Sequence, residues 1–408
     1  MDTRTRRRGI IIGGSLSGLF AALALRCRGW DVDVFERVEA ELAGRGAGIV
    51  VQPQVRAVLA AIGLDPAVAL GVTVQMRKTL DFDGGVIGAA ECPQTVTSWD
   101  QVYRLLRDAF PSAHYHRGHT LVRVETHDRS VSAHFAEAPS IEADLLVGAD
   151  GLRSAVREQF VPGFAPLYAG YIAWRALVPE SAFPQGSCED LFDIMAFCLP
   201  PGEQALGYPI VGADNAVQPD RRRYNFVWYR PADELGELPG LLTDASGFTH
   251  GGSIPPPLIR PEVIAQMRQA AMTRLAAPFR QVVRLATHPF IQPIYDLESP
   301  RLAFGRVAIV GDAAFVARPH VAAGVVKAAE DALCLAEALE QIDDVEQALR
   351  QFERIRRDIG QRIVERARHL GAPMQAQQRT SEERARAARH HTPEAVMAET
   401  AVMDFLYR

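Results

Sequence analysis

A glycine-rich turn near the N-terminus contains the first residues whose types and spacing could bind a cofactor. Gly13, Ser15 and Gly18 occupy the fixed positions of the G-x-G-x-x-G pattern, directly after the apolar run 10–12. This pattern allows a tight turn and close packing of the next helix, whose first N–H groups can bind a pyrophosphate. Serine in the middle position is small enough to leave that approach open. The turn therefore predicts a dinucleotide-binding site.

An acidic residue follows at the end of the next apolar segment. Glu36 comes directly after 32–35, and a carboxylate there can accept hydrogen bonds from both hydroxyls of an adenosine ribose. A 2′-phosphate would be repelled at this point. The predicted nucleotide is therefore FAD or NAD rather than NADP.

Two further apolar segments end on residues of the same kind. Segment 145–147 leads to Asp150, and segment 305–310 leads to Gly311 and Asp312. Asp150 alone would be a common turn residue, and Asp312 alone would serve equally well as a helix N-cap. The three strand ends together are typical of one parallel sheet, because α/β folds bind ligands where the carboxyl ends of such strands meet.

Periodicity predicts the elements around these turns. Alternation and aromatic residues indicate an antiparallel sheet in the middle of the chain, with Tyr171 and Arg175 on one face and Trp174 on the other. Its predicted strands are 168–177, 191–199, 205–211 and 223–229, with a hairpin at 79–87 and an irregular stretch at 231–261. Predicted helices include 55–62, 99–110, 262–275 and 345–370.

Length and composition are those of a globular protein with about two folding units. The 408 residues carry a net charge of −5, which gives no electrostatic reason to expect nucleic acid or an anionic membrane as partner.

Five scattered cysteines suit a reducing cytoplasm and argue against a zinc site. No apolar run reaches the roughly 20 residues of a membrane span. Basic residues at 4–8 could open a signal peptide, but the paired glycines and the second predicted strand, which ends at Glu36, favour a dinucleotide-binding unit.

These motifs and three others resemble one known family up to about residue 370. The others are Gly48-Ile-Val-Val-Gln-Pro53, Tyr168-Ala-Gly-Tyr-Ile-Ala-Trp-Arg175 and Arg318-Pro-His320. The sequence is similar to the FAD-dependent aromatic hydroxylases, the single-component flavoprotein monooxygenases related to para-hydroxybenzoate hydroxylase. The resemblance implies an α/β fold, with a Rossmann-like FAD-binding domain around a parallel sheet, an antiparallel-sheet substrate domain and C-terminal helices. The implied ranges are 1–73, 98–165 and 285–370 for the FAD-binding domain, 74–97 and 166–284 for the substrate domain, and 371–408 for a helical tail.

The resemblance also implies which residues bind FAD, and it implies no metal ligand. Asp312 would bond the ribityl chain, Asp150 would serve FAD and NADH or NADPH together, and Pro319 would border the isoalloxazine ring. The full implied set is Gly13, Gly14, Ser15, Leu16, Ser17, Gly18, Glu36, Arg37, Arg45, Gly48, Ile49, Val50, Asp150, Gly311, Asp312, Ala322, Ala323 and Gly324.

The chemistry that the resemblance implies is hydroxylation of an electron-rich aromatic or N-heteroaromatic ring. NADH or NADPH would reduce FAD, O2 would add to give a flavin C4a-hydroperoxide, and the substrate ring would attack its distal oxygen. Removing a phenol or hydroxypyridine proton activates the ring, so a base should face the substrate. His320 is the first candidate and Tyr208 the second, and either residue could instead be structural. The implied partners are a small aromatic substrate and O2, and a homodimer is left open.

The sequence departs from the family pattern at three positions. Phe315 stands where many members have histidine, Val321 where glycine is usual, and Trp99 where an arginine often opens the helix. Other functions of the same superfamily are a flavin halogenase or a prenyl-chain reductase, but no Trp-x-Trp-x-Ile-Pro signature or long aliphatic substrate region is present. An NAD-dependent dehydrogenase and a non-catalytic flavin-binding protein are the alternatives from other classes.

Overall fold

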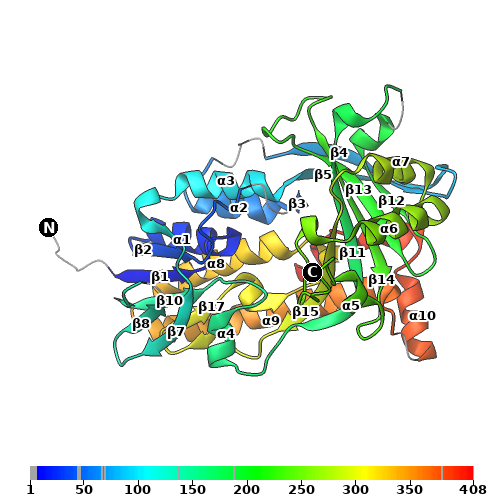
Figure 1. The fold of residues 1–408 in the computed structure, drawn as a ribbon. Helices are drawn as coiled ribbons and strands as arrows, with labels where there is room; N and C mark the ends of the chain where they lie inside the picture. Colours follow the sequence, from blue (N-terminus) through cyan, green and yellow to red (C-terminus); the bar gives the residue numbers. More distant parts are fainter. Residues whose placement is uncertain are drawn as a thin grey trace.

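Two large β-sheets lie side by side and divide the molecule into two halves (Figure 1). The structure is a computed structural model that describes residues 7–43, 47–65, 68, 70–136, 138–186, 189–377 and 380–407. None of the helices within these ranges combines the length and the apolar character needed to span a membrane.

The first half is built on a six-stranded sheet with the order β16-β17-β10-β1-β2-β6. Its strands are β1 (Arg8–Ile12), β2 (Asp31–Glu36), β6 (Tyr115–Arg117), β10 (Leu145–Gly148), β16 (Ala303–Phe304) and β17 (Val307–Ile309). All neighbours are parallel except β16, which is antiparallel to β17. Because β1, β10 and β17 are adjacent and run in one direction, the three predicted strand ends meet at one edge of the sheet.

Helices from distant parts of the chain pack on this sheet. They are α1 (Leu16–Cys27), α2 (Pro53–Ala61), α3 (Trp99–Ala109), α8 (Gly324–Gln341) and α9 (Val345–Gly371). α1 contacts β1, α3 and α8, and α8 in turn contacts α2 and α9. α1 is buried on nearly every side, which explains why its sequence is apolar all round rather than striped.

The second half is built on a nine-stranded sheet with the order β18-β15-β11-β14-β13-β12-β4-β5-β3. Its strands are β3 (Gly48–Val51), β4 (Val72–Leu80), β5 (Val86–Ser98), β11 (Leu167–Pro179), β12 (Ile194–Cys198), β13 (Gln204–Ile210), β14 (Arg223–Pro231), β15 (Phe290–Glu298) and β18 (Phe315–Val316). Every pairing that we describe in it is antiparallel apart from β4 with β12. The predicted fold class is confirmed.

The two faces of the nine-stranded sheet have different neighbours. Trp174 and Trp228 face a core that includes residues of α6 (Pro261–Arg274) and α7 (Ala277–Leu285). Tyr171, Tyr208 and Tyr229 belong to the other face, which is turned toward the six-stranded sheet and the C-terminal segment. The predicted alternation of β11 is therefore correct, because its pleat sends successive side chains to opposite faces.

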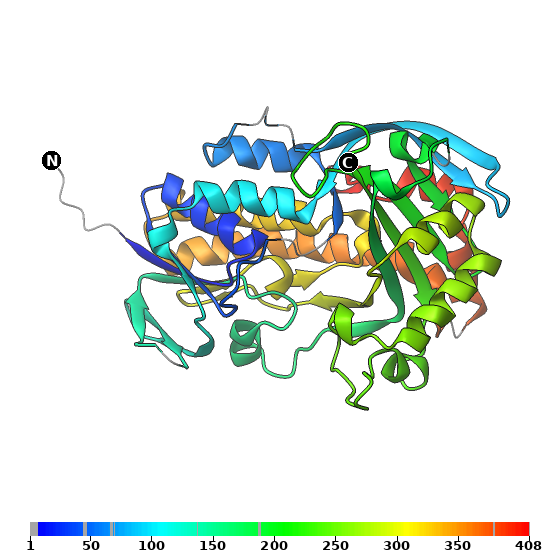
Figure 2. The same cartoon turned by 45° about the horizontal axis from the view of Figure 1, so that its top comes forward.

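Smaller elements complete both halves. A three-stranded meander is formed by β7 (Leu121–Thr126), β8 (Val131–Phe135) and β9 (Ile141–Ala143). α4 (Ala155–Phe160) follows the Asp-Gly turn, and α10 (Ser381–Arg389) and α11 (Pro393–Glu399) belong to the C-terminal tail. Figure 2 shows that α10 and α11 lie with the nine-stranded sheet.

Three sequence-based predictions differ from the structure. Residues 189–193 form a short 3₁₀ segment, so the strand predicted to begin at 191 begins at Ile194. Stretch 231–261, expected to be irregular, contains α5 (Glu237–Leu241). A second helix, α7, follows α6 after a break, because Pro278 fits the first turn of a new helix but not a helix interior.

Three strands of the nine-stranded sheet, β3, β15 and β18, lie in ranges proposed for the FAD-binding domain. β3 pairs with β5, β15 pairs with β11, and β18 pairs with β15. The chain passes between the halves several times, so both sheets are assembled from separate stretches of sequence.

We predict that Gly18→Ala destabilises the protein. A Cβ atom at Gly18 would lie 1.9 Å from the Gly13 carbonyl oxygen, so α1 would have to move away from β1. We expect a loss of about 1–3 kcal/mol, the usual cost of overpacking, measured by urea unfolding at a fixed FAD concentration. The control is Gly240→Ala, where a Cβ atom meets nothing within 4 Å and stability should change by at most about 1 kcal/mol. Equal unfolding midpoints for both variants would contradict the close approach.

Candidate active site

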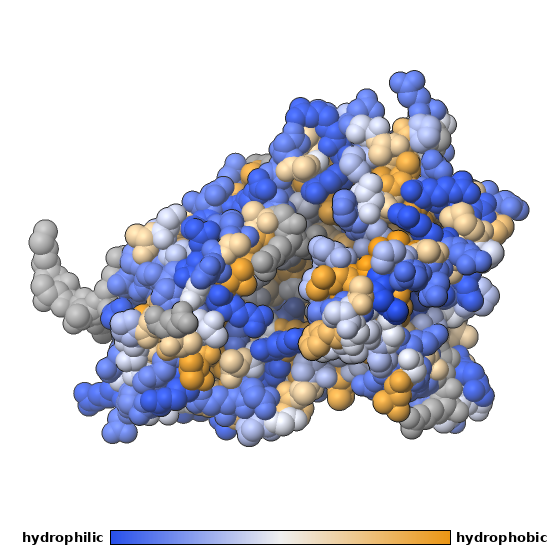
Figure 3. All heavy atoms as spheres, viewed as in Figure 1, coloured by the Kyte–Doolittle hydropathy of each residue, from blue (hydrophilic) through white to orange (hydrophobic). Residues whose placement is uncertain are grey.

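Two adjoining cavities lie where the carboxyl edge of the six-stranded sheet meets the nine-stranded sheet. The larger cavity has a volume of about 330 Å³, and the smaller cavity about 290 Å³. Ser15 and Trp99 line both of them. Figure 3 shows the surface hollowed between the two halves of the molecule. An elongated ligand could therefore extend from one cavity into the other.

The N-terminus of α1 lies at the junction of the cavities. Ser15 is its N-cap, but the serine side chain makes no capping hydrogen bond. Ser15, Leu16 and Ser17 line the larger cavity. The first N–H groups of a helix have no partner within it, and the helix dipole adds positive potential there. This helix end is therefore suited to bind an anionic group such as a pyrophosphate.

Gly13 explains how α1 begins so close to the sheet. Its φ of +103° lies in the left-handed region, and a Cβ atom there would lie 2.4 Å from the Ala149 carbonyl oxygen. Only glycine fits this turn without moving the backbone after β10. The predicted role of Gly13 in the tight turn is confirmed.

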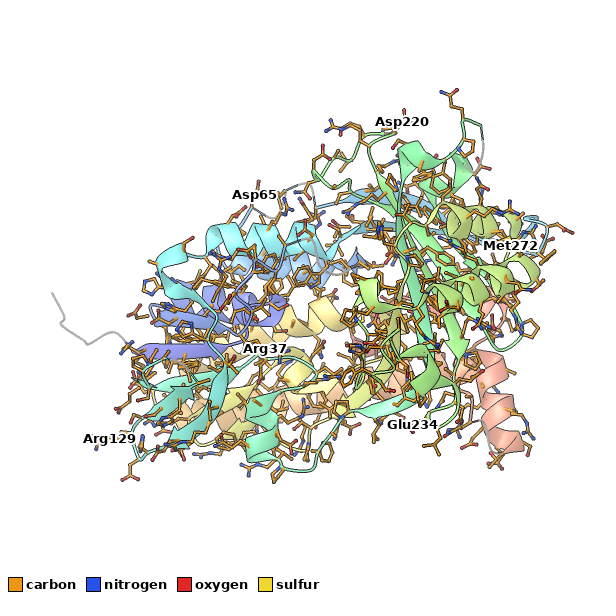
Figure 4. The ribbon with its side chains drawn as sticks, in the orientation of Figure 1. Arg37, Asp65, Arg129, Asp220, Glu234 and Met272 are labelled. Carbon is orange, nitrogen blue, oxygen red and sulfur yellow. The ribbon has the colours of Figure 1, made fainter. Side chains whose placement is uncertain are left out.

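Glu36 and Arg37 line the smaller cavity at the end of β2. The Glu36 side chain is only 6% exposed. Its Oε2 accepts a hydrogen bond from the Gly14 N–H and its Oε1 one from the Val38 N–H, both at 2.9 Å. Each oxygen has capacity for another hydrogen bond, so ribose hydroxyls could bind without displacing these contacts. Arg37 is labelled in Figure 4 on the left half of the molecule, which contains the six-stranded sheet.

Asp150 lines the smaller cavity as well. Its Oδ2 accepts hydrogen bonds from the N–H groups of Ala155 at 2.7 Å and Val156 at 3.2 Å, at the start of α4. Its Oδ1 is buried and has no hydrogen-bond partner among the residues that the structure describes. Burial raises the pKa of Asp150, although these hydrogen bonds act in the opposite direction. The unpartnered oxygen is therefore suited to a hydrogen-bond donor of a ligand.

Asp312 lies in the 3₁₀ turn Gly311–Ala313 and lines the larger cavity. It sits inside this turn and caps no α-helix, so the N-cap alternative is wrong. Its Oδ1 accepts a hydrogen bond from the buried Lys327 Nζ at 2.9 Å. The Gly311 N–H donates to Asp331 Oδ2 at 2.9 Å, and Arg356 Nε donates to Asp331 Oδ1 at 2.7 Å. The buried ion pair of Asp331 and Arg356 therefore supports the turn through the Gly311 N–H.

Two backbone segments border the larger cavity. Gly48, Ile49 and Val50 belong to β3, where the Gly48 N–H donates to Asn225 Oδ1 at 2.9 Å. The other segment includes Pro319 and runs through residues 322–324, where Ala322 has a φ of +50°. Arg45, also predicted to bind the cofactor, lies outside the described residues.

His320 is buried beside the larger cavity and contacts two tyrosines. Its Nε2 lies 2.9 Å from the Tyr171 hydroxyl oxygen, and its ring centroid lies 4.4 Å from that of Tyr229. Its Nδ1 has no hydrogen-bond partner within the described part of the chain. Burial lowers the pKa of His320 to about 3, and the charge of Arg318 acts in the same direction. The imidazole is therefore neutral near pH 7.

The sheet face opposite this histidine carries Arg175, Tyr208 and Tyr229, which all line the larger cavity. Arg175 Nη1 donates to Gln292 Oε1 at 2.8 Å. We find no carboxylate paired with Arg175 in the described ranges, so its charge is not neutralised by the protein. Burial raises the pKa of Tyr208 to about 12, against the opposing effect of Arg175, so Tyr208 is protonated at neutral pH.

The arrangement fits FAD on structural grounds. The uncapped helix end at Ser15 suits a pyrophosphate, the Glu36 carboxylate suits a ribose, and Asp312 is half-exposed toward the larger cavity. Both cavities share a border, as a dinucleotide that spans them requires. No cluster of three or more potential metal ligands occurs in the described ranges.

Some residues of the site were not predicted from the sequence. Lys327 pairs with Asp312, and Arg157 joins two turns by donating to Leu152 O at 2.7 Å and to Ala313 O at 3.0 Å. Tyr229 is next to His320. A single lysine within the apolar start of α8 was a signal for Lys327, because a buried cation requires a partner. Nothing local in the sequence connects Arg157 with residue 313.

Family comparison agrees with this geometry. The family described as "FAD binding domain" matches residues 7–228, more than half of the chain. A second family, described as "FAD binding domain-like", matches residues 168–296. The two matches together extend over residues 7–296, which include most strands of both sheets but not β16, β17 or β18.

Individual relatives span almost the whole chain. The 2,6-dihydroxypyridine 3-monooxygenase of Paenarthrobacter nicotinovorans is 33% identical over 91% of this chain and 92% of its own length. The 3-amino-4-hydroxybenzoate 2-monooxygenase of Streptomyces cremeus is 31% identical over 88% of this chain and 86% of its own.

Solved structures show the same fold. The 2,6-dihydroxypyridine-3-hydroxylase of Arthrobacter nicotinovorans superposes with a TM-score of 0.85 at 32% identity, covering 91% of this chain and 93% of that one. A Klebsiella pneumoniae protein solved with FAD and uric acid has a TM-score of 0.76 at 24% identity, covering 98% and 97%. The fold, the FAD-suited cavities and these matches lead to one conclusion: the chain belongs to the family of FAD-dependent monooxygenases.

Proposed function

We propose that this protein hydroxylates a small, electron-rich aromatic or N-heteroaromatic ring that bears an ionisable hydroxyl group, using NADH or NADPH and O2. The observation that carries the proposal is the unpartnered Nδ1 of a buried, neutral His320 beside a cavity that also contains an unneutralised Arg175. Bound FAD would supply the activated oxygen. The protein would bind the ring, exclude water and remove its proton.

In this proposal His320 accepts the proton of the substrate hydroxyl at Nδ1. This requires hydrogen on Nε2, which would then be donated to the Tyr171 oxygen 2.9 Å away. Tyr171 would thus fix the tautomer that leaves Nδ1 free. With a pKa near 3, the imidazole is unprotonated near neutral pH.

Arg175 would favour the binding of a substrate in its anionic form. The positive charge of its guanidinium would stabilise the phenolate or hydroxypyridinate that forms when the proton leaves. Because a bound substrate would displace water from the cavity, such an interaction would be stronger there than in bulk water. The protonated hydroxyls of Tyr208 and Tyr229 could donate further hydrogen bonds to the same anion. Tyr208 is thus better suited as a donor than as the base.

The relatives suggest which rings to test first. Their names specify 2,6-dihydroxypyridine and 3-amino-4-hydroxybenzoate as substrates, and both rings carry hydroxyl groups. The decisive experiment is oxygen uptake and product analysis with purified protein, FAD, NADH or NADPH, and a panel of phenols and hydroxypyridines. A halogenase, a reductase or a passive flavin-binding protein would consume no oxygen into a hydroxylated product.

We predict that Glu36→Arg weakens FAD retention. The variant removes the acceptor expected at the adenosine ribose and places a cation beside the Gly14 N–H, and losing one such acceptor costs about 1–3 kcal/mol when a partner stays unpaired. Purified protein should show reduced flavin absorbance relative to wild type. Glu142→Arg in β9 makes the same charge change on an exposed residue that lines neither cavity, and it should retain full flavin.

We predict that Asp312→Ala also weakens FAD retention. The half-exposed carboxylate would no longer be available to the ribityl chain, and the buried Lys327 would lose its anionic partner. Asp312→Asn keeps an acceptor oxygen and should retain more FAD than Asp312→Ala. Flavin content equal to wild type in both variants would exclude Asp312 from cofactor binding.

We predict that His320→Ala leaves FAD bound but slows hydroxylation most at low pH. Loss of a general base costs about 10²–10⁴-fold. The variant should recover as the pH rises above the pKa of the substrate hydroxyl, because the ring then ionises without help. Wild type should lack this pH dependence near neutrality, since its imidazole titrates only near pH 3.

Two further variants separate the roles around His320. Tyr171→Phe keeps the ring packing but removes the group that fixes the tautomer, so its rate should fall less than that of His320→Ala. Tyr208→Phe should weaken substrate binding without changing the shape of the pH profile. If His320→Ala shows an unchanged rate, product yield per NADH and pH profile, this histidine is structural.

A further inference from the structure

The C-terminal strap, defined here as residues 393–403, crosses from one half of the molecule to the other. Val396 and Met397 are buried in the core on the inner face of the nine-stranded sheet. Met403 is buried in the core of the six-stranded half. In Figures 1 and 2 the C-terminus lies between the two halves in both views. The strap is therefore part of the folded structure rather than a loose surface segment.

Three polar side chains hold the strap by its backbone. Arg77 Nη1, on a fully buried side chain in β4, donates to the Met397 carbonyl. Gln52 Nε2 and Gln94 Nε2 both donate to the Ala401 carbonyl at 3.0 Å. These donors satisfy carbonyl groups at and beyond the end of α11, where the helix itself offers no partner. The position of the strap is thus fixed by two strands of the nine-stranded sheet and by the residue that precedes α2.

The strap is also tied directly to the residue proposed as the base. The Ala401 N–H donates to the His320 carbonyl oxygen at 2.7 Å. Ala401 has a φ of +56°, a left-handed conformation that alanine rarely adopts. Such a conformation persists only where the surrounding contacts determine it, and the three hydrogen bonds of Ala401 provide those contacts.

Thr400 and Ala401 form part of the wall of the larger cavity. The Thr400 side chain is only 6% exposed, and its hydroxyl makes no hydrogen bond with any residue that the structure describes. A hydroxyl at a cavity wall without a partner in the protein is free to bond a ligand. Since the same cavity is lined by His320 and Tyr229, the hydroxyl lies where a ring substituent could become its partner.

We propose that Thr400 binds the aromatic substrate through its hydroxyl, and that the strap is a specificity-determining wall of the active site. The proposal rests on the proposed function above. A hydroxyl can both donate and accept one hydrogen bond, so Thr400 suits a second polar substituent on the ring, apart from the hydroxyl that faces His320. Arg77, Gln52 and Gln94 act as positioning residues that hold this wall in place.

The test compares three threonine substitutions in the full-length, FAD-loaded protein. Thr400→Val removes the hydroxyl at nearly constant volume, and Thr400→Ser retains it. Thr392→Val is the matched control, since Thr392 directly precedes the strap, caps α11 through the Ala395 N–H, and does not line the cavity. Binding of 2,6-dihydroxypyridine and of phenol is followed by the change in flavin absorbance, and product per NADH is measured in parallel.

We expect Thr400→Val to raise the Kd for 2,6-dihydroxypyridine about 3–10-fold, the effect of losing one hydrogen bond, and to lower the product formed per NADH. Phenol, which has no second polar substituent, should bind equally to wild type and variant. Thr400→Ser and Thr392→Val should bind both rings as wild type does, and flavin content should be the same in all four proteins.

The outcomes separate the two proposals. If wild type hydroxylates no ring of the panel, the proposed function fails, and the role of Thr400 fails with it. If wild type hydroxylates a ring with two polar substituents and Thr400→Val binds it with an unchanged Kd, only the role of Thr400 is overturned. An equal rise of the Kd in Thr392→Val would also overturn the role of Thr400. It would show that the substitutions affect binding by destabilising the strap and not by removing the Thr400 hydroxyl.

Discussion

The close approach of α1 to the ends of β1 and β10 is the constraint on which the rest of the structure depends. Gly13 and Gly18 bring backbone atoms so near to each other that no side chain fits between them. This contact places the uncapped N-terminus of α1 at the carboxyl edge of the parallel sheet, and both cavities border it. A helix displaced by the width of a methyl group would leave its N–H groups away from the cavity junction.

Buried charges then fix the loops that complete the site. Lys327 is next to Asp312, the Asp331–Arg356 pair supports Gly311, and Arg318 pairs with Asp296 at 2.9 Å. A buried charge without a partner is very unfavourable, so each pair favours one loop arrangement over others. Charged and polar side chains therefore define the positions of turns that have little apolar surface of their own.

The two faces of the nine-stranded sheet have different roles: one packs against helices, and the other borders the larger cavity. One face packs tryptophans against α6 and α7, whereas the other presents tyrosines and Arg175 to the larger cavity. The chain uses a rigid sheet, rather than a loop, to hold the groups that would contact the substrate. Groups held by a regular sheet keep their distances better than groups on a mobile segment.

Local sequence signals were sufficient for much of this protein. Apolar runs that end in glycine and aspartate predicted three parallel strands meeting at one edge, and alternation predicted which side chains of β11 share a face, because both properties follow from chain periodicity alone. Contacts between distant residues could not be read in this way. The neutral state of His320 beside Tyr171, the Arg157 link between two turns, and the passage of the strap past Thr400 depend on burial and on which segments the fold brings together. Only the tertiary structure decides these features, since neither the burial of a side chain nor its partner is a property of the neighbouring sequence.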